Sequence, residues 1–466
     1  MTRMRLPRSL RIFVLLLCTV LVSALGYGVY LLSRLAPIGT AYAAKTLCSG
    51  VFVSQRDAAD VIREDIRADN HPLLRAIYAS VDPSNKTASA TFFGLARRNA
   101  MFRSGRGCAL AFDQAERADP LPEINPPASA GEDFAADTDR RVDAAQLRSA
   151  VDWAFNEPDP QKLRRTRAVV VLHRGRLLAE RYAIGFSAQT PMLGWSMTKS
   201  VTGALIGILI RRGKLSLQDN ALVPQWRGQS DPRAQITLDQ LLRMTSGLRF
   251  TENHSDPLED VALMLFARRD AAAFAIDKPL QAPPGTRWSY SSGTSNILAA
   301  VMRPAIGGSE REYLEFPRQA LFGPLGMRNA VLESDESGTF VASSYLYASP
   351  HDWARFGQFL LQDGAWNGTR ILPEGWVRYM STLTPQSTRR DFGAHLWVKV
   401  TSPFNSLLQP PPQLPADTFH AVGHEGQFVS VIPSRQLVVV RLGLSRGQHV
   451  WDHEAFLAML VAAVPP

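Results

Sequence analysis

The hydrophobic pattern is most continuous at two places along the chain. The first is an uncharged apolar run of about 21 residues at positions 12–32, which is long enough to cross a bilayer as a helix. The second covers residues 197–210, which are apolar on almost every face of a helix. A helix of this kind has to be buried. The pattern therefore predicts one helix outside the folded body and one at its centre.

The N-terminal run predicts a membrane anchor. The four arginines before it (Arg3, Arg5, Arg8 and Arg11) place the N-terminus in the cytoplasm and export the rest of the chain. Residues 41–44 resemble a signal-peptide cleavage site. We favour an uncleaved anchor over residues 1–33, because the apolar run is longer than a usual signal core and Arg34 separates it from that site. This predicts an inner-membrane protein whose folded part lies in the periplasm or outside the cell.

Residues 45–114 predict a small α/β module next to the membrane. Strands are expected at residues 51–54 and 88–93, and helices at 58–69 and 73–81. Cys48 and Cys108 both lie in the exported part, where an oxidising compartment would allow a disulfide between them; two free thiols are the alternative. Residues 115–140 are rich in proline, aspartate and alanine and predict a linker.

Residues 141–466 show strand patterns near both ends and helix patterns between them, which indicates one α+β domain. A helix is expected at 142–156, and Arg174-Gly175-Arg176 joins a β-hairpin. The middle is mostly helical, including 238–244, and Ser349 opens a further helix with a capping box. Strand patterns return at 419–422, 427–432 and 437–442, before a last helix at 451–464. Strands at both ends predict one antiparallel sheet with a helical lobe, and a site between them.

Composition narrows the possible partners. The chain is 45% hydrophobic and 20% charged, as in ordinary globular proteins. Its net charge of +9 includes the four N-terminal arginines, and the remainder forms no basic stripe, so no nucleic-acid partner is expected. The histidine pairs His420/His424 and His449/His453 lack a third ligand and a nearby carboxylate, so neither a metal nor another cofactor is expected.

Chemistry is concentrated at the start of the central apolar helix. Ser196 lies in its first turn, where free backbone N–H groups and the helix dipole favour a developing oxyanion. Lys199 is the only lysine of the chain with a serine three residues before it, and that spacing places both on one face. Burial lowers the pKa of a lysine and makes it a base near neutrality. The pair indicates a serine nucleophile with a lysine base; a capped helix with a snorkelling lysine is the alternative.

Two further segments could complete such a site. Tyr290 lies in the turn-rich segment 283–292 and could carry a proton between nucleophile and leaving group; a buried tyrosine that only donates a hydrogen bond is the alternative. His424 lies between glycines just before a strand, and such glycines allow a ligand to approach the backbone closely. A lone histidine is, however, more often structural.

These three segments, in this order, resemble the motifs of the serine β-lactamase superfamily. They read Ser196-Met197-Thr198-Lys199, Tyr290-Ser291-Ser292 and His424-Glu425-Gly426. The resemblance covers about residues 141–466 and is greatest to class C-like esterases and 6-aminohexanoate-dimer hydrolases. It implies a β-lactamase/transpeptidase-like fold. It also implies a set of roles: Ser196 as acylated nucleophile, Lys199 as base, Tyr290 in proton transfer, the backbone N–H groups of Ser196 and Gln427 as oxyanion hole, and Ser292, His424 and Gly426 in the substrate pocket.

The departures from that pattern shape the expected function. Ser292 stands where β-lactamases carry asparagine, and His424-Glu425 stands where they carry Lys-Thr. We expect Glu425 to repel the carboxylate of a β-lactam. The sequence therefore predicts a membrane-anchored serine hydrolase that cleaves small esters or amides through an acyl-enzyme. A D,D-peptidase or penicillin-binding protein acting on peptidoglycan, and an inactive family member that binds a partner, are the alternatives. Nothing in the sequence indicates an oligomeric state.

Overall fold

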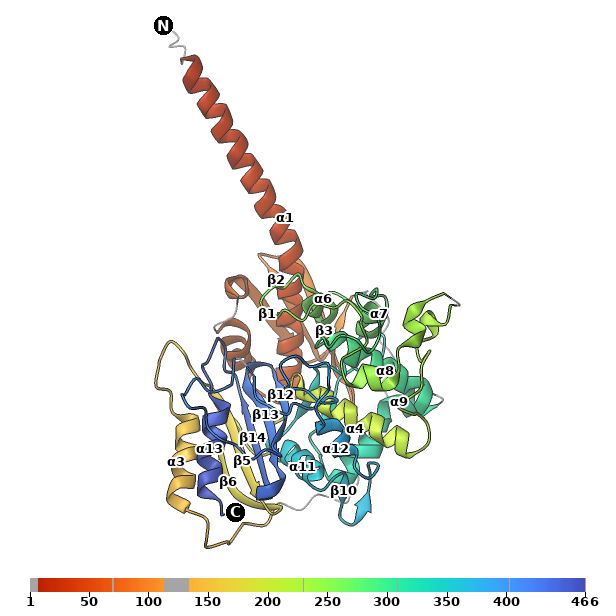
Figure 1. The fold of residues 1–466 in the computed structure, drawn as a ribbon. Helices are drawn as coiled ribbons and strands as arrows, with labels where there is room; N and C mark the ends of the chain where they lie inside the picture. The colour runs from red at the N-terminus through yellow and green to blue at the C-terminus, as the bar shows by residue number, and fades with distance from the viewer. Residues whose placement is uncertain are drawn as a thin grey trace.

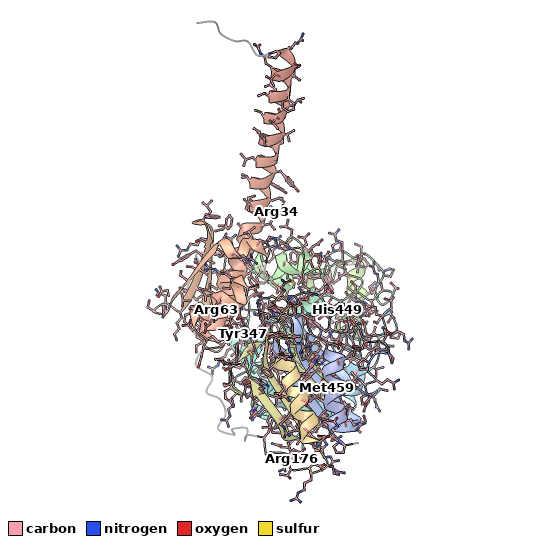
Figure 2. The ribbon with its side chains drawn as sticks, turned by 90° about the vertical axis from the view of Figure 1, so that its left-hand side faces the viewer. Arg34, Arg63, Arg176, Tyr347, His449 and Met459 are labelled. Atoms are coloured by element: carbon pink, nitrogen blue, oxygen red, sulfur yellow. A yellow bond between two sulfur atoms is a disulfide. The ribbon has the colours of Figure 1, made fainter. Side chains whose placement is uncertain are left out.

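A long N-terminal helix, α1 (Arg8–Phe52), projects from a rounded body (Figure 1). The computed structural model describes residues 7–68, 71–112, 134–228, 230–307, 309–401 and 403–465. The outer part of α1 exposes large apolar side chains and is long and apolar enough to cross a membrane. From Ala36 onward the helix is largely buried, and Figure 2 shows Arg34 where the helix meets the body. One helix therefore spans the predicted anchor and the start of the predicted module.

The N-terminal module is built around the buried half of α1. An antiparallel meander packs on it in the order β1-β2-β3-β4. The apolar core between them includes Ala44 and Leu47 of α1. The elements are α2 (Ala58–Asp60), η1 (Val61–Arg67), η2 (Pro72–Ala76), β1 (Ile77–Asp82), β2 (Thr87–Phe92), β3 (Leu95–Arg103) and β4 (Gly107–Ala111).

Two local predictions for this module are wrong. Residues 51–54, expected as a strand, are the end of α1 and the turn after it. Residues 73–81, expected as a helix, are split between η2 and β1. In both places tertiary packing overrides local propensity: α1 continues because its last turns are buried, and Ile77 begins a strand because it pairs with Phe92.

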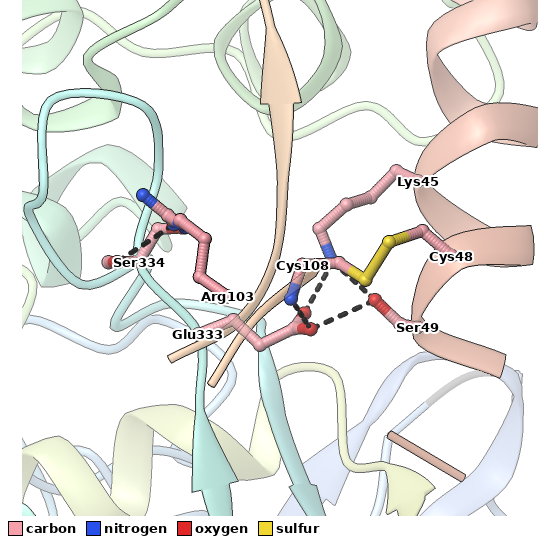
Figure 3. The surroundings of a disulfide bond; sticks show 7 residues. All are labelled: Lys45, Cys48, Ser49, Arg103, Cys108, Glu333 and Ser334. Carbon is pink, nitrogen blue, oxygen red and sulfur yellow. Dashed lines mark hydrogen bonds and ion pairs between the residues drawn. A yellow bond between two sulfur atoms is a disulfide. The ribbon is translucent and has the colours of Figure 1, made fainter. Parts of the chain in front are cut away.

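A disulfide closes the module, and a buried charge cluster beside it joins the module to the rest of the protein (Figure 3). Cys48 of α1 is bonded to Cys108 of β4. Beside this disulfide the Glu333 carboxylate is fully buried and pairs with Lys45. It also accepts hydrogen bonds from the Ser49 hydroxyl (2.9 Å) and the Cys108 N–H (2.7 Å). Because Glu333 belongs to the large domain, α1 is fixed in that domain as well as in the module.

The segment that joins the module to the large domain was predicted as a linker over residues 115–140. Most of it lies outside the described residues. From residue 134 onward the chain runs beside β6, where Ala136 forms a bridge with Leu177.

The large domain contains a five-stranded antiparallel sheet in the order β12-β13-β14-β5-β6. Strands from the beginning and the end of the domain's sequence meet where β5 pairs with β14, as the sequence predicts. Both faces of the sheet are buried. Successive residues of β5 point to opposite faces, and Val169 and Val170 accordingly lie in different apolar cores. Helices α3 and α13 cover one face and α11 covers the other (Figure 1). These elements are α3 (Ala144–Phe155), β5 (Thr166–His173), β6 (Arg176–Tyr182), α11 (Pro350–Leu361), β12 (Phe419–Gly423), β13 (Gln427–Ile432), β14 (Leu437–Gly443) and α13 (His453–Ala463).

The helical lobe is organised around α4 (Met197–Arg211), whose residues from Met197 to Leu209 are all buried. This confirms the predicted central helix. Sheet and lobe together form the predicted α+β, β-lactamase/transpeptidase-like fold. The remaining elements are β7 (Met192–Leu193), η3 (Pro224–Trp226), η4 (Pro232–Gln235), α5 (Leu238–Leu242), α6 (Asp260–Phe266), α7 (Ala271–Ile276), α8 (Ser292–Ile306), α9 (Glu310–Pro317), η5 (Arg318–Phe322), α10 (Gly323–Leu325), β8 (Val331–Leu332), β9 (Leu346–Ala348), β10 (Ala365–Trp366), β11 (Thr369–Arg370), α12 (Trp376–Ser381), η6 (His424–Gly426) and η7 (Pro433–Arg435).

Candidate active site

A tight turn before α4 positions Ser196. Gly194 packs so closely on Trp353 that a Cβ would lie 2.3 Å from its ring. Trp195 follows with φ of +48°, a left-handed conformation that a bulky residue rarely adopts and that is often found at functional sites. Ser196 is therefore held at the head of the helix, partly exposed, while Met197 after it is buried.

Lys199 lies directly below Ser196 and is 2% exposed. Its Nζ donates to the Ser196 Oγ (3.0 Å), the Ser292 Oγ (3.0 Å) and the Ser343 carbonyl (3.1 Å). Burial lowers the pKa of Lys199 to about 8, against the opposing charge of Glu252. None of its three direct acceptors is a carboxylate. A lysine in this environment exchanges its proton near neutral pH.

Glu252 is a site residue that sequence reasoning missed. Its carboxylate accepts from the Ser292 N–H (2.7 Å) and the Ser292 Oγ (2.5 Å). Burial acts to raise its pKa, but His254 and Lys199 outweigh burial and lower it, so Glu252 is ionised at neutral pH. Its loop carries no motif or periodicity that marks it. Only the fold brings this carboxylate close to Lys199, with the Ser292 hydroxyl between them.

Ser292 was predicted in the substrate pocket and instead lies in the interior. It is 1% exposed and links Lys199 to Glu252 through its hydroxyl. It is the first residue of α8, so its N–H has no partner within that helix and is free to bind Glu252.

Tyr290 reaches the same place from the segment before α8. Its ring centroid is 4.9 Å from the Lys199 Nζ, and its hydroxyl interacts with Ser196. Phe392 and Trp397 pack against the ring. Burial, together with the charge of Glu252, raises the pKa of Tyr290 well above its usual value, so the phenol keeps its proton. The structure thus brings together the three side chains predicted to carry the chemistry.

The edge of the large sheet borders this site. Gly423 packs against the backbone of the α4 entry, where a Cβ would lie 2.2 Å from the Gly194 carbonyl oxygen. Gln427 pairs with Gly423 across β12 and β13 and is held by its side chain, which donates to the Gly443 carbonyl (2.6 Å). The backbone of Gln427 is therefore fixed at the end of β13 that adjoins the start of α4.

The turn between β12 and β13 corrects one expectation about charge. Glu425 is 6% exposed and has a left-handed φ of +62°. Its carboxylate accepts from the Arg446 Nε (2.6 Å) and the Trp195 Nε1 (3.3 Å). Its charge is compensated in the interior, so the expected repulsion of a substrate carboxylate by Glu425 is wrong. Gly426 is also buried, where a Cβ would lie 2.5 Å from the guanidinium of Arg441.

His424 is the member of this turn that faces solvent. Its ring meets Trp195 edge-on with centroids 5.7 Å apart and stacks on His254 at 4.8 Å. Both histidines line a cavity beside Trp195. By contrast, His420 and His453 are buried and both hydrogen-bond the Ser430 hydroxyl at 2.8 Å. Within the described residues, no group of three histidine, cysteine, aspartate or glutamate side chains could hold a metal ion.

Comparison with known proteins places the chain in one family. The family model described as "Beta-lactamase" matches residues 149–462, and the chain belongs to this family. Its class is therefore that of the serine hydrolases related to β-lactamases and penicillin-binding proteins.

Among curated relatives, 6-aminohexanoate-dimer hydrolase of Paenarthrobacter ureafaciens is 27% identical over 224 residues, which cover 46% of this chain and 56% of that protein. The match thus spans a little over half of that relative. An uncharacterized Mycobacterium tuberculosis protein is 28% identical over 332 residues, covering 58% of this chain and 80% of that protein.

Solved structures share the fold. A candidate 6-aminohexanoate-dimer hydrolase from Bacillus anthracis superposes with a TM-score of 0.56 at 23% identity, covering 72% of this chain and 88% of that chain. A penicillin-binding protein homologue from Caulobacter crescentus superposes with a TM-score of 0.53 at 14% identity, covering 72% of this chain and all of that chain. At these identities the likeness concerns the fold alone.

Proposed function

We propose that this chain is a membrane-anchored serine hydrolase that cleaves esters or amides through an acyl-enzyme on Ser196. The observation that carries the proposal is the Lys199 Nζ at 3.0 Å from the Ser196 Oγ, in a site that lowers the pKa of Lys199 to about 8. At pH 7 roughly a tenth of such a lysine is neutral, which is enough for a general base.

Acylation begins when neutral Lys199 takes the proton of the Ser196 hydroxyl. The Ser196 oxygen then attacks the substrate carbonyl carbon, and the tetrahedral oxyanion is stabilised by the backbone N–H groups of Ser196 and Gln427. As the bond to the leaving group breaks, the Tyr290 hydroxyl protonates the leaving oxygen or nitrogen and is reprotonated from the Lys199 ammonium. The raised pKa of Tyr290 suits a proton donor that rests as the neutral phenol.

Deacylation uses the same groups in the reverse sense. A water molecule attacks the acyl carbonyl, and its proton passes to neutral Lys199. The Ser196 oxygen leaves as the tetrahedral intermediate collapses and recovers a proton from Lys199. The products are a carboxylic acid and an alcohol or amine, and the enzyme returns to its starting protonation state.

The proposed anchor is supported by the burial of the residues that resemble a signal-peptide cleavage site. Residues 41–44 lie inside α1, and Ala41, Ala43 and Ala44 are completely buried. Lys45 and Cys48, just beyond, join the helix to Glu333 and Cys108. Cleavage there would require this packed segment to unfold into an extended, accessible strand. We therefore propose that α1 remains attached, with the catalytic domain in the periplasm or outside the cell.

The proposed substrates are esters or amides rather than β-lactams. His424 and Glu425, the latter paired with Arg446, stand where a β-lactamase presents a lysine to the substrate carboxylate, so this turn offers that group no permanent cation. Amide cleavage also fits the name of the relative that is a 6-aminohexanoate-dimer hydrolase.

The test is a burst experiment on the full chain with a short nitrophenyl ester. We expect a pre-steady-state burst of nitrophenol in the wild type that is absent from Ser196→Ala. Ser216→Ala, on the exposed loop after α4, is the matched control and should behave as wild type. Equal turnover by Ser196→Ala would refute the proposal.

A D,D-peptidase would instead release D-alanine from D-alanyl-D-alanine peptides faster than it hydrolyses esters. An inactive binding protein would show neither reaction and no covalent label on Ser196.

A further inference from the structure

An apolar cavity of about 230 Å³ lies between α1 and α6. Leu35, Ile38 and Tyr42 of α1 form one wall, and Ala262 and Phe266 of α6 belong to the opposite wall. The two helices contact each other where the Tyr42 and Phe266 rings meet edge-on at 5.5 Å. The site described above does not account for this cavity, whose lining is mostly aliphatic and aromatic.

One end of the cavity begins where the apolar outer segment of α1 ends. Leu32, the last exposed large apolar residue of that segment, is 41% exposed, and Leu35 lies one helical turn further along the same helix. From Leu35 to Tyr42 the wall extends about 10 Å along α1. If the outer segment spans the bilayer, this end of the cavity lies at the membrane surface.

The other end of the cavity is lined by residues that neighbour the proposed oxyanion hole in the chain. Trp195 and His424 line it; Trp195 directly precedes Ser196, and His424 lies three residues before Gln427. These residues adjoin the two N–H groups that would hold the substrate carbonyl. The carbonyl carbon carries two substituents, the acyl chain and the leaving group. Tyr290, which would protonate the leaving group, does not line the cavity, so the acyl chain is the substituent assigned to it.

A second feature marks the base of α1 as a membrane surface. Phe93 and Leu95, at the turn between β2 and β3, are 77% and 71% exposed. The Thr40 hydroxyl donates to the Ala96 carbonyl at 2.7 Å, so this turn lies against α1 close to where the helix enters the body. Exposed aromatic and aliphatic side chains at this level are typical of insertion into the interface of a bilayer.

We propose that the cavity holds the acyl chain of a membrane amphiphile, so that the substrates are esters or amides of medium-length fatty acids taken from the adjoining leaflet. This rests on the proposed function and names its substrate class. The volume lies below the range of about 300–1,000 Å³ that accommodates a drug-sized ligand. It therefore fits one unbranched chain, with the polar remainder of the amphiphile beyond the end that His254 and His424 line.

The test measures kcat/KM of the full chain in phospholipid vesicles with nitrophenyl acetate, butyrate, hexanoate and octanoate. In the wild type we expect a rise of about fourfold for each added methylene until the cavity is filled. Ala262→Phe places a ring in the cavity and should abolish this rise while leaving acetate hydrolysis unchanged. Ala273→Phe, at a half-buried position of α7 outside the cavity, is the control and should keep the rise.

The outcomes separate this inference from the function on which it rests. A wild-type profile that is flat with chain length, or an Ala262→Phe profile that still rises, overturns the acyl-chain site even if Ser196 is essential. Acetate hydrolysis that survives in Ser196→Ala overturns the proposed function itself. If Ala262→Phe loses acetate hydrolysis as well, the variant is damaged and the wild-type profile alone decides.

Discussion

Two buried lysine–serine pairs lie in different regions of this protein, and we propose a catalytic role for only one of them. In the N-terminal module the Lys45 Nζ is 2.9 Å from the Ser49 Oγ. In the helical lobe the Lys199 Nζ is 3.0 Å from the Ser196 Oγ. Both ammonium groups are almost completely buried, and burial lowers the pKa of both.

The pairs differ in where their protons are held. The Ser49 hydroxyl donates to Glu333, and Lys45 pairs with the same carboxylate (Figure 3). Ser49 is also completely buried, so no substrate reaches it. Among the residues that the structure describes, Lys199 has no direct carboxylate partner, because the Ser292 hydroxyl separates it from Glu252.

The comparison shows that distance between lysine and serine does not by itself make a nucleophile. A carboxylate in direct contact stabilises the ammonium form and turns the pair into a structural cross-link. A carboxylate that is separated from the lysine by a hydroxyl group leaves the lysine able to lose its proton. A solvent-accessible serine beside that lysine can then act as a nucleophile toward a substrate.

The largest expected effect on activity comes from Lys199→Met. Loss of the base should lower kcat by about 10³-fold or more, with little change in thermal unfolding because no buried carboxylate loses a direct partner. The measurement is ester hydrolysis beside circular dichroism melting, with the exposed Lys214→Met as control. Unchanged turnover in Lys199→Met would mean that the Lys199–Ser196 pair, like the Lys45–Ser49 pair, has no catalytic role.

The opposite result is expected for Lys45→Met. Removing one partner of a buried ion pair leaves Glu333 uncompensated and should destabilise the protein by about 3–5 kcal/mol. Hydrolysis measured well below the melting temperature should not change. The double variant Lys45→Met/Glu333→Gln should recover much of the lost stability. If the single variant melted like the wild type, the cluster beside the disulfide would not hold the module in place.

The fold could be predicted from the sequence where local pattern and tertiary packing agree. The hairpin around Gly175, the capping box at Ser349 and the uniformly apolar α4 all form where expected. The prediction failed at residues 51–54 and 73–81, because the local sequence of such short segments does not reveal their long-range contacts. There the continuation of α1 and the pairing of Ile77 with Phe92 decide the structure.

The candidate site divides in the same way. Ser196 and Lys199 share one helix, so their spacing predicts their contact, and Tyr290 follows from motif order. Glu252 and Arg446 were not predictable, because each reaches the site from a loop whose path only the folded structure defines. The charge of Glu425 was evident from the sequence, but its partner Arg446 was not.

The smallest expected effect, and the sharpest test of the comparison, comes from Glu252→Gln. Because neutral Lys199 is the proposed base, kcat/KM should rise with pH through the Lys199 pKa of about 8. The charge of Glu252 raises that pKa, so its removal should lower it and move the rising limb toward lower pH. Activity at pH 6.5 relative to the plateau should then increase by a few-fold. The exposed Glu374→Gln should leave the profile unchanged. A Glu252→Gln limb that coincides with the wild type, or that moves to higher pH, would mean that this carboxylate acts on Ser292 alone and leaves the Lys199 proton unaffected.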